Sequence, residues 1–365
     1  MENILIVMLT AQGGRHVLVH RERGVSKARQ VYNFRQSILD FDAVLAHIAD
    51  GVRECIRQGL TPEALALCTQ ERGGVLLDKQ DELLWCAQAA ASQQIVDAVH
   101  QLVRPQALYY ASGMQCRAEN ILYSLAALRM QDSTVPQRAV HFASVVDYLN
   151  YRLTGILRQE YTCAIATGLV DAAQKTWNTD LLCALQLPAK LFSAALCMPG
   201  QALGTLRPQL ARETGFQGQV FLAPHAAAAV CRVLPKATAV FLCGKDKILL
   251  GMRTSLLALS EKGYQDGFSY WDSSEGYLCC CVSDTSAKTS AETLCRLERQ
   301  AGEKAVAVYA PNARETHETA LERLGLPLLT QPREAAALAA ALQIMLPTNS
   351  SATPCEDFWR TTSAV

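Results

Sequence analysis

Two histidines four positions apart are the first residues whose spacing suggests metal binding. On a helix, His16 and His20 would share one face, as paired zinc ligands do. They fall instead in the alternating segment His-Val-Leu-Val-His, and such alternation predicts a β-strand. On that strand we expect both histidines to flank a polar edge, so no metal site is predicted from them.

Cysteine is the second residue type that could do chemistry, since the chain has 14 of them. No two cysteines are separated by two residues, and the contiguous Cys279-Cys280-Cys281 cannot surround a tetrahedral ion. Most of the others, such as Cys68 and Cys163, stand among apolar residues, where a thiol behaves as a small hydrophobe. The sequence therefore predicts reduced cysteines in the core rather than a metal centre or disulfides.

Gly13 and Gly14 separate two apolar runs, residues 4–9 and 16–20. A Gly-Gly turn between such runs predicts a β-hairpin. The amides of a glycine turn can also face an anion, which makes both residues weak candidates for nucleotide phosphate binding. A plain hairpin turn is the interpretation that we favour.

The charge balance excludes some partners, because Lys plus Arg and Asp plus Glu number 34 each. Without a net field, neither nucleic acid nor an anionic membrane is expected to bind. No segment approaches the ~18 consecutive apolar residues of a membrane-spanning helix. Residues 1–4 lead straight into a predicted strand without a basic region, so no signal peptide is expected and the predicted location is the cytoplasm.

The elements that would position these residues follow from apolar spacing along the 365 residues, a length sufficient for two cores. Helical spacing predicts helices at 43–58, 92–103, 119–129, 139–151, 176–187, 225–233, 288–300, 312–324 and 333–346. Short apolar runs predict strands at 64–68, 74–77, 219–222, 305–309 and 326–330.

A hairpin opens each half of the chain, at 4–20 and again at 238–251. Mixed strands and helices follow each hairpin, which indicates α/β layers. The repetition suggests two ribonuclease-H-like domains, as in actin-like ATPases and sugar kinases. We expect the first domain at 1–237, the second at 238–346 and a loose tail at 347–365.

Motifs along the chain resemble the FGGY family of carbohydrate kinases, and within it the L-rhamnulose kinases. The most specific is Asp147-Tyr-Leu-Asn-Tyr-Arg-Leu-Thr-Gly155, with Glu160-Tyr-Thr162 after it. Further similar segments are 110–115, 120–125, 169–171, 177–182, 199–204, 223–230, 261–276 and 305–346. A gap near 281–286 stands where the family has a long helical insertion, so the resemblance implies a shortened second domain.

The resemblance also implies where the general base should stand. A sugar kinase removes a proton from the attacking hydroxyl, and in this family the base is an Asp directly after a His at the start of a helix. Here the His is His225 and the next residue is Ala226, which has no group that accepts a proton. We therefore assign no catalytic residue and expect impaired phosphoryl transfer.

Other positions depart from the family in the same direction. At the end of the first strand, the family's Asp that positions metal and phosphate is replaced by Met8-Leu9-Thr10. In the second hairpin, one glycine of the family's phosphate-binding Gly-Thr pair is kept, in Gly244-Lys245-Asp246. The family's glycines that approach adenine are replaced by Ala310-Pro311-Asn312. Thr69-Gln70-Glu71-Arg72 and Gln88-Ala89 replace sugar-binding residues, and Asp78 is interpreted as a turn residue.

Three functions remain open from the sequence. The favoured one is a rhamnulokinase-like homologue that has lost most catalysis, a pseudokinase. The second is an active kinase that phosphorylates L-rhamnulose or a related ketose with ATP and Mg²⁺, using Glu71 or Asp246 as the acid. The third is a binding module for a sugar or a nucleotide. The partner that the resemblance suggests is a small-molecule sugar, whereas a protein partner cannot be predicted.

Overall fold

The computed structural model describes residues 1–309 except 23–24, 70–71, 88–89, 234–236, 244–246, 274–275 and 285–286, and also residues 324, 326, 328 and 329. The predicted helix at 333–346, the tail at 347–365 and nearly all of the predicted helix at 312–324 lie outside the described residues.

The first of two six-stranded sheets has the strand order β12-β13-β4-β1-β2-β3. Its strands are β1 Asn3–Thr10, β2 Gly13–Glu22, β3 Val25–Phe34, β4 Ala64–Thr69, β12 Ala202–Thr205 and β13 Gln219–Leu222. The predicted hairpin is confirmed, because β1 pairs antiparallel with β2, and β1 also runs parallel to β4. The third strand, β3, was not predicted, since most of its residues are polar and lie at the sheet edge.

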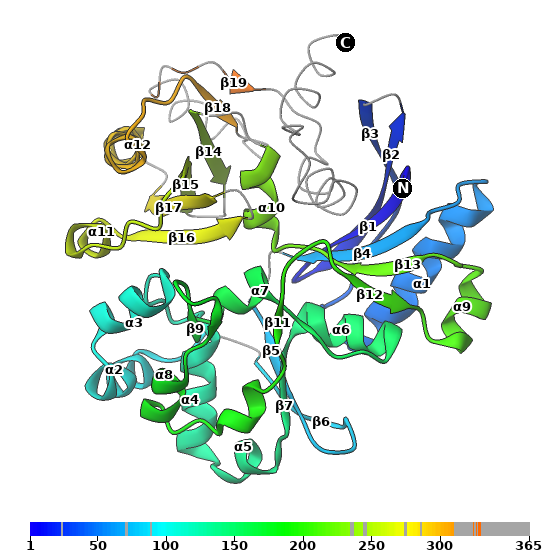
Figure 1. The fold of residues 1–365 in the computed structure, drawn as a ribbon, viewed down its shortest axis with the longest axis horizontal. Coiled ribbons are helices and arrows are strands. Elements are labelled where there is room, and N and C mark those ends of the chain that lie inside the picture. The colour runs from blue at the N-terminus through cyan, green and yellow to red at the C-terminus, as the bar shows by residue number, and fades with distance from the viewer. Residues whose placement is uncertain are drawn as a thin grey trace.

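The second sheet repeats this arrangement, in the order β16-β17-β15-β14-β18-β19. Its strands are β14 Thr238–Cys243, β15 Lys247–Thr254, β16 Phe268–Ser273, β17 Gly276–Asp284, β18 Ala307–Tyr309 and β19 Leu328–Leu329. Here too a predicted hairpin, β14 with β15, is antiparallel, and β14 runs parallel to a later strand, β18. The two sheets draw on separate halves of the chain, which is the duplicated ribonuclease-H-like architecture of the actin-like fold (Figure 1).

A largely helical region follows the first sheet's β4. Its helices are α2 Gln93–Leu102, α3 Pro105–Ser112, α4 Ile121–Gln131, α5 Thr134–Arg138, α6 Val145–Thr154, α7 Tyr161–Ile165, α8 Thr179–Ala184 and the short η1 Ala189–Phe192. The same region contains a small sheet of three strands, β5 Gly74–Leu77, β6 Leu83–Cys86 and β7 His141–Ser144. It also contains two pairs of short strands: β8 Gln159–Glu160 pairs with β11 Leu196–Cys197, and β9 Val170–Asp171 pairs with β10 Thr176–Trp177.

Two predicted helices in this region were partly wrong. The segment predicted as a helix at 139–151 begins as the strand β7, which pairs with β5, and becomes helical only at Val145. The strand ends and the helix begins at Ser144, because its side chain accepts a hydrogen bond from the Asp147 amide and caps α6. Similarly, the predicted helix at 176–187 starts with β10 and is helical only over Thr179–Ala184.

The remaining helices are α1 Phe41–Arg57, α9 Pro208–Thr214, α10 Ala226–Val233, α11 Glu261–Gln265 and α12 Ala287–Ala301. Asp40 caps α1, which buries Val44, Ile48 and Val52 in one core with β1 and β4. In Figure 1, α10 lies between the two sheets, and it contacts β16 and β17 of the second sheet. The junction between the lobes is therefore built around the start of α10.

Candidate functional site at the junction between the lobes

His225 stands directly before α10 and contacts the second lobe through its ring. The imidazole stacks on the indole of Trp271 in β16, with ring centroids 4.3 Å apart and planes 14° apart. Both residues are buried. The side chain at position 225 is thus held against the second sheet, which fixes where the following residue, Ala226, begins the helix.

A chain of hydrogen bonds connects the same point to the first lobe. The backbone N–H of His225 donates to Oγ1 of Thr162 at 2.7 Å, and the Thr162 hydroxyl donates to Oε2 of Glu160 at 2.7 Å. Glu160 also caps α7, since its carboxylate accepts from the amides of Thr162 and Cys163. The segment Glu160-Tyr-Thr162, singled out in the sequence, therefore anchors the start of α10.

Glu160 also belongs to a buried pair of acidic residues, together with Asp147. Asp147 accepts hydrogen bonds from the Ser144 hydroxyl at 2.7 Å and from the Glu160 amide at 3.2 Å. Burial raises the pKa of Glu160 to about 7 and holds the pKa of Asp147 well above its usual range. Because protein donors occupy both groups, we assign them to structure and not to proton transfer from a substrate.

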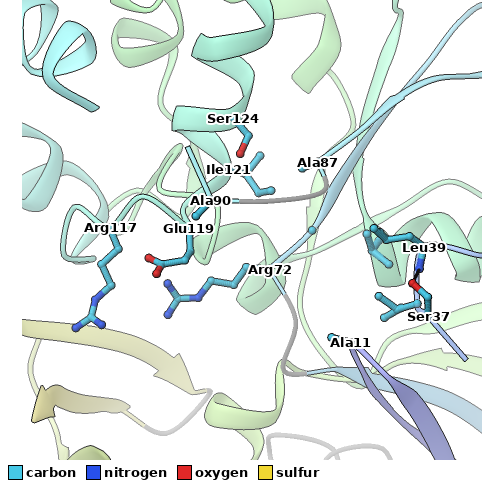
Figure 2. Close-up of a pocket in the computed structure, with 13 residues that line it drawn as sticks. Ala11, Ser37, Leu39, Arg72, Ala87, Ala90, Arg117, Glu119, Ile121 and Ser124 are labelled. Carbon is cyan, nitrogen blue, oxygen red and sulfur yellow. Dashed lines mark hydrogen bonds between the residues drawn. The ribbon is translucent and has the colours of Figure 1, made fainter. Parts of the chain in front are cut away.

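A cavity of about 560 Å³ opens beside this junction (Figure 2). Its lining comes from the turn after β1, the segment before α1, the residues after β4 and β6, the loop into α4, α4 itself and the start of α6. The lining residues are Ala11, Ser37, Ile38, Leu39, Arg72, Gly73, Ala87, Ala90, Arg117, Glu119, Ile121, Ser124 and Val145. A volume of this size is typical of small-molecule sites.

Three charged residues, Arg72, Arg117 and Glu119, are among the lining residues. Figure 2 shows the guanidinium group of Arg72 next to the carboxylate of Glu119, whereas the side chain of Arg117 extends away from both, toward the second sheet. Arg72 donates to Oδ1 of Asn120 at 3.2 Å and lies over the Trp271 ring, 5.5 Å from its centroid. Burial and the nearby Arg117 lower the pKa of Arg72. Trp271 therefore lies next to both Arg72 of the cavity lining and the ring of His225.

The position implied for the general base carries no proton acceptor in the structure either. Ala226 is the first residue of α10 and presents only a methyl group. Among the described residues that line the cavity, Glu119 is the one carboxylate. Glu71 and Asp246, the two acids suggested as replacements, lie outside the described residues, as do Gly244, Gln88, Ala89 and residues 310–312.

Gly13 and Gly14 lie at the start of β2, opposite the end of β1. A Cβ at either glycine would collide with Phe34 of β3, and Gly13 also has a φ of +149°. Close packing of the hairpin against β3 therefore explains both glycines. Whether their amides also hold a phosphate stays a prediction.

One interpretation of the histidine pair was wrong. His16 is fully buried rather than at a polar edge, and its Nε2 lies 3.1 Å from the carbonyl oxygen of Ile48 in α1. Gly51 of α1 leaves the space that the imidazole fills. His20 is partly exposed and contacts Asn3. Asp78 is a turn residue, as expected, because its carboxylate accepts the amides of Gln80 and Glu82.

Sequence reasoning did not single out the charged residues of the cavity. Arg117 and Glu119 lie in a loop without a motif, and Arg72 was noted only as part of a segment that departs from the family. The one indication in the sequence was that these three charged residues lie next to apolar segments. Trp271 was missed because nothing in the sequence indicates that it meets His225.

Known structures identify the class of this fold. The structure of xylulose kinase from Lactobacillus acidophilus superposes with a TM-score of 0.74 at 13% identity, covering 94% of this chain and 89% of that one. Glycerol kinase from Plasmodium falciparum, solved with ADP, gives a TM-score of 0.74 at 10% identity and the same coverage. At such identities the likeness shows the fold alone, which is that of the sugar kinases.

Sequence comparison then gives the family. Residues 9–230 match the family model described as the FGGY family of carbohydrate kinases, N-terminal domain. The chain belongs to the FGGY family of carbohydrate kinases. It is similar to the rhamnulokinase of Halalkalibacterium halodurans, with 28% identity over 264 residues, and to that of Oceanobacillus iheyensis, with 27% over 278 residues. These matches cover 69% and 73% of this chain but only 56% and 59% of the relatives.

The described part of the chain shows neither a metal-binding cluster nor a membrane-spanning helix. Three or more His, Cys, Asp or Glu side chains do not come together there in a group that could bind a metal ion. No described helix is both long and apolar enough to cross a membrane.

Proposed function

We propose that this rhamnulokinase-like member of the FGGY family has impaired phosphoryl transfer. The observation that carries the proposal is Ala226, which follows His225 at the start of α10 where the family resemblance implies a carboxylate base. Removing a general base typically lowers a rate by about 10²–10⁴-fold. The nearby acids Glu160 and Asp147 are buried and hydrogen-bonded to protein groups, so they do not replace it.

The end of β1 supports the same proposal. Met8 and Leu9 are buried there, and the hydroxyl of Thr10 donates to the carbonyl oxygen of Gly13 at 3.0 Å. Mg²⁺ with ATP prefers carboxylate ligands, and these residues supply none. The residues at this strand end therefore do not fit a metal-phosphate group.

A coupled assay of ADP release tests the proposal. The purified protein is incubated with ATP, Mg²⁺ and L-rhamnulose or related ketoses, and a rhamnulokinase is assayed alongside as the positive control. We expect a turnover at least about 10³-fold below that control. Turnover at the rate of the control would show that the proposal is wrong. If Glu119→Gln then abolished that turnover, Glu119 would be the replacement base.

Binding of ATP is tested separately by thermal unfolding. A ligand that binds the folded state raises the melting temperature in proportion to the logarithm of its excess over Kd. We expect ATP with Mg²⁺ to leave the melting temperature unchanged. An increase of several degrees at millimolar ATP would indicate that nucleotide binding survives without the strand-end carboxylate.

A further inference from the structure

Among the described residues that line the cavity beside the junction, arginines outnumber carboxylates. Two arginines and one glutamate supply all the charged side chains among its described lining residues. A pocket for a neutral sugar typically offers acceptors as well as donors to the hydroxyl groups, but an arginine offers donors alone. Two guanidinium groups and one carboxylate therefore favour a ligand that carries negative charge.

Arg72 is held in place by a neutral partner, and the carboxylate near its guanidinium belongs to the exposed Glu119. Its Nη1 donates to the side-chain oxygen of Asn120, a neutral acceptor, and its plane is near the Trp271 ring. No ion pair within 4.0 Å joins Arg72 to a carboxylate among the described residues. Most of its five N–H donors are therefore left for a ligand.

Arg117 has even fewer partners. The described part of the chain shows no hydrogen bond and no ion pair from its guanidinium group, although the residue is half-buried. Its charge acts on Arg72 and on the buried thiol of Cys280 in β17. Two like charges placed together at a half-buried site repel each other, and a bound anion would relieve that repulsion.

We infer that this cavity binds a small polyhydroxylated anion, a phosphate ester or a carboxylate of a sugar, with Arg72 and Arg117 as the groups that hold the negative charge. Guanidinium groups match the oxygen geometry of both anions. Ser124 and Ser37 add hydroxyl groups to the lining. The inference deepens the proposed function, on which it rests, because it names the ligand class of a family member that does not transfer phosphate.

Isothermal titration calorimetry on the full chain tests this inference. The probes are L-rhamnulose 1-phosphate, D-gluconate, neutral L-rhamnulose and inorganic phosphate. We expect at least one of the two sugar anions to bind at least tenfold more tightly than the neutral sugar, and the affinity to fall as salt concentration rises. A preference for the phosphate ester assigns a phosphate site, and a preference for gluconate assigns a carboxylate site.

The key variant is Arg117→Gln, because that guanidinium has no described partner whose loss would unfold the protein. We expect it to weaken binding of the preferred anion at least tenfold. Arg212→Gln, at an exposed arginine of α9 outside the cavity lining, is the matched control and should leave the affinity unchanged. Glu119→Gln removes the opposing charge and should tighten binding a few-fold.

Three results would overturn the inference: equal affinity for neutral and anionic sugars, an unchanged affinity in Arg117→Gln, or inorganic phosphate that binds as tightly as the preferred sugar anion. None of these depends on turnover. A protein that binds sugar anions but also phosphorylates L-rhamnulose at the control rate would refute the proposed function alone.

Discussion

The ammonium group of Lys175 lies 2.7 Å from Oδ2 of Asp272, and this ion pair joins the two lobes. Asp272 is in β16 of the second sheet, whereas Lys175 stands between β9 and β10. The Tyr161 hydroxyl, at the start of α7, donates to the same carboxylate oxygen at 3.1 Å. Since the carboxylate is buried, it depends on these two partners for its stability.

We predict that Lys175 and Asp272 are energetically coupled. Lys175→Met leaves a buried carboxylate with one neutral donor, which we expect to lower the free energy of unfolding by about 2–3 kcal/mol. A double-mutant cycle with Asp272→Asn should give a coupling energy of about 1 kcal/mol or more, measured by urea denaturation. The exposed pair Arg152 with Asp42, 2.8 Å apart, is the control and should couple less. Equal coupling in both cycles would argue against an interlobe role.

A second prediction concerns the hydroxyl that anchors α10. Thr162→Val keeps the shape of the side chain but removes the acceptor of the His225 amide and one of the two donors to Oε2 of Glu160, which keeps the Cys163 amide. We expect a loss of about 2–4 kcal/mol in stability, because unsatisfied buried polar groups are costly. Thr214→Val, at a buried hydroxyl that bonds only within its own helix and the next turn, is the control and should cost less. Similar losses in the two variants would contradict the anchoring role.

The third prediction is a pH dependence. Burial lowers the pKa of His16 to about 4, from 6.5 in the unfolded chain. The unfolded state therefore takes up a proton first, and stability falls as the pH drops from about 6.5 to about 4, by up to roughly 3 kcal/mol. His16→Leu should remove this part of the acid sensitivity, while His20→Gln should retain it. Urea denaturation between pH 4.5 and pH 7 measures the difference, and identical pH profiles for the parent and His16→Leu would disprove the assignment.

The fourth prediction concerns the glycine that makes room for His16. In an ordinary helix, Gly to Ala stabilises by up to about 1 kcal/mol. In α1, a methyl group at position 51 would collide with the His16 ring, so Gly51→Ala should destabilise by about 1–3 kcal/mol. In the His16→Ala background the space is open, and the same substitution should cost much less. Thermal unfolding of the four proteins tests this, and additive effects would show that the ring and the glycine are independent.

Much of the fold could be predicted from local patterns. The hairpin that opens each half, the strand at 219–222 and the helix α1 each bury residues at regular spacing, and this periodicity can be read from neighbouring residues. The strand β7 could not be predicted, because residues 139–151 are apolar enough for either a strand or a helix. Its pairing with β5, more than sixty residues earlier, decided the outcome.

The candidate site also combines features that the sequence predicts with features that depend on the tertiary structure. That Ala226 lacks a proton acceptor is a property of one residue, and no fold can change it. Three other features depend on segments far apart in the chain. His225 stacks on Trp271, Arg72 and Arg117 line one cavity, and His16 is buried. The sequence by itself determined the family and the chemistry that each side chain can offer. Only the tertiary structure decided which of those side chains meet and how much water they retain, because contacts between distant segments and burial arise when the whole chain packs.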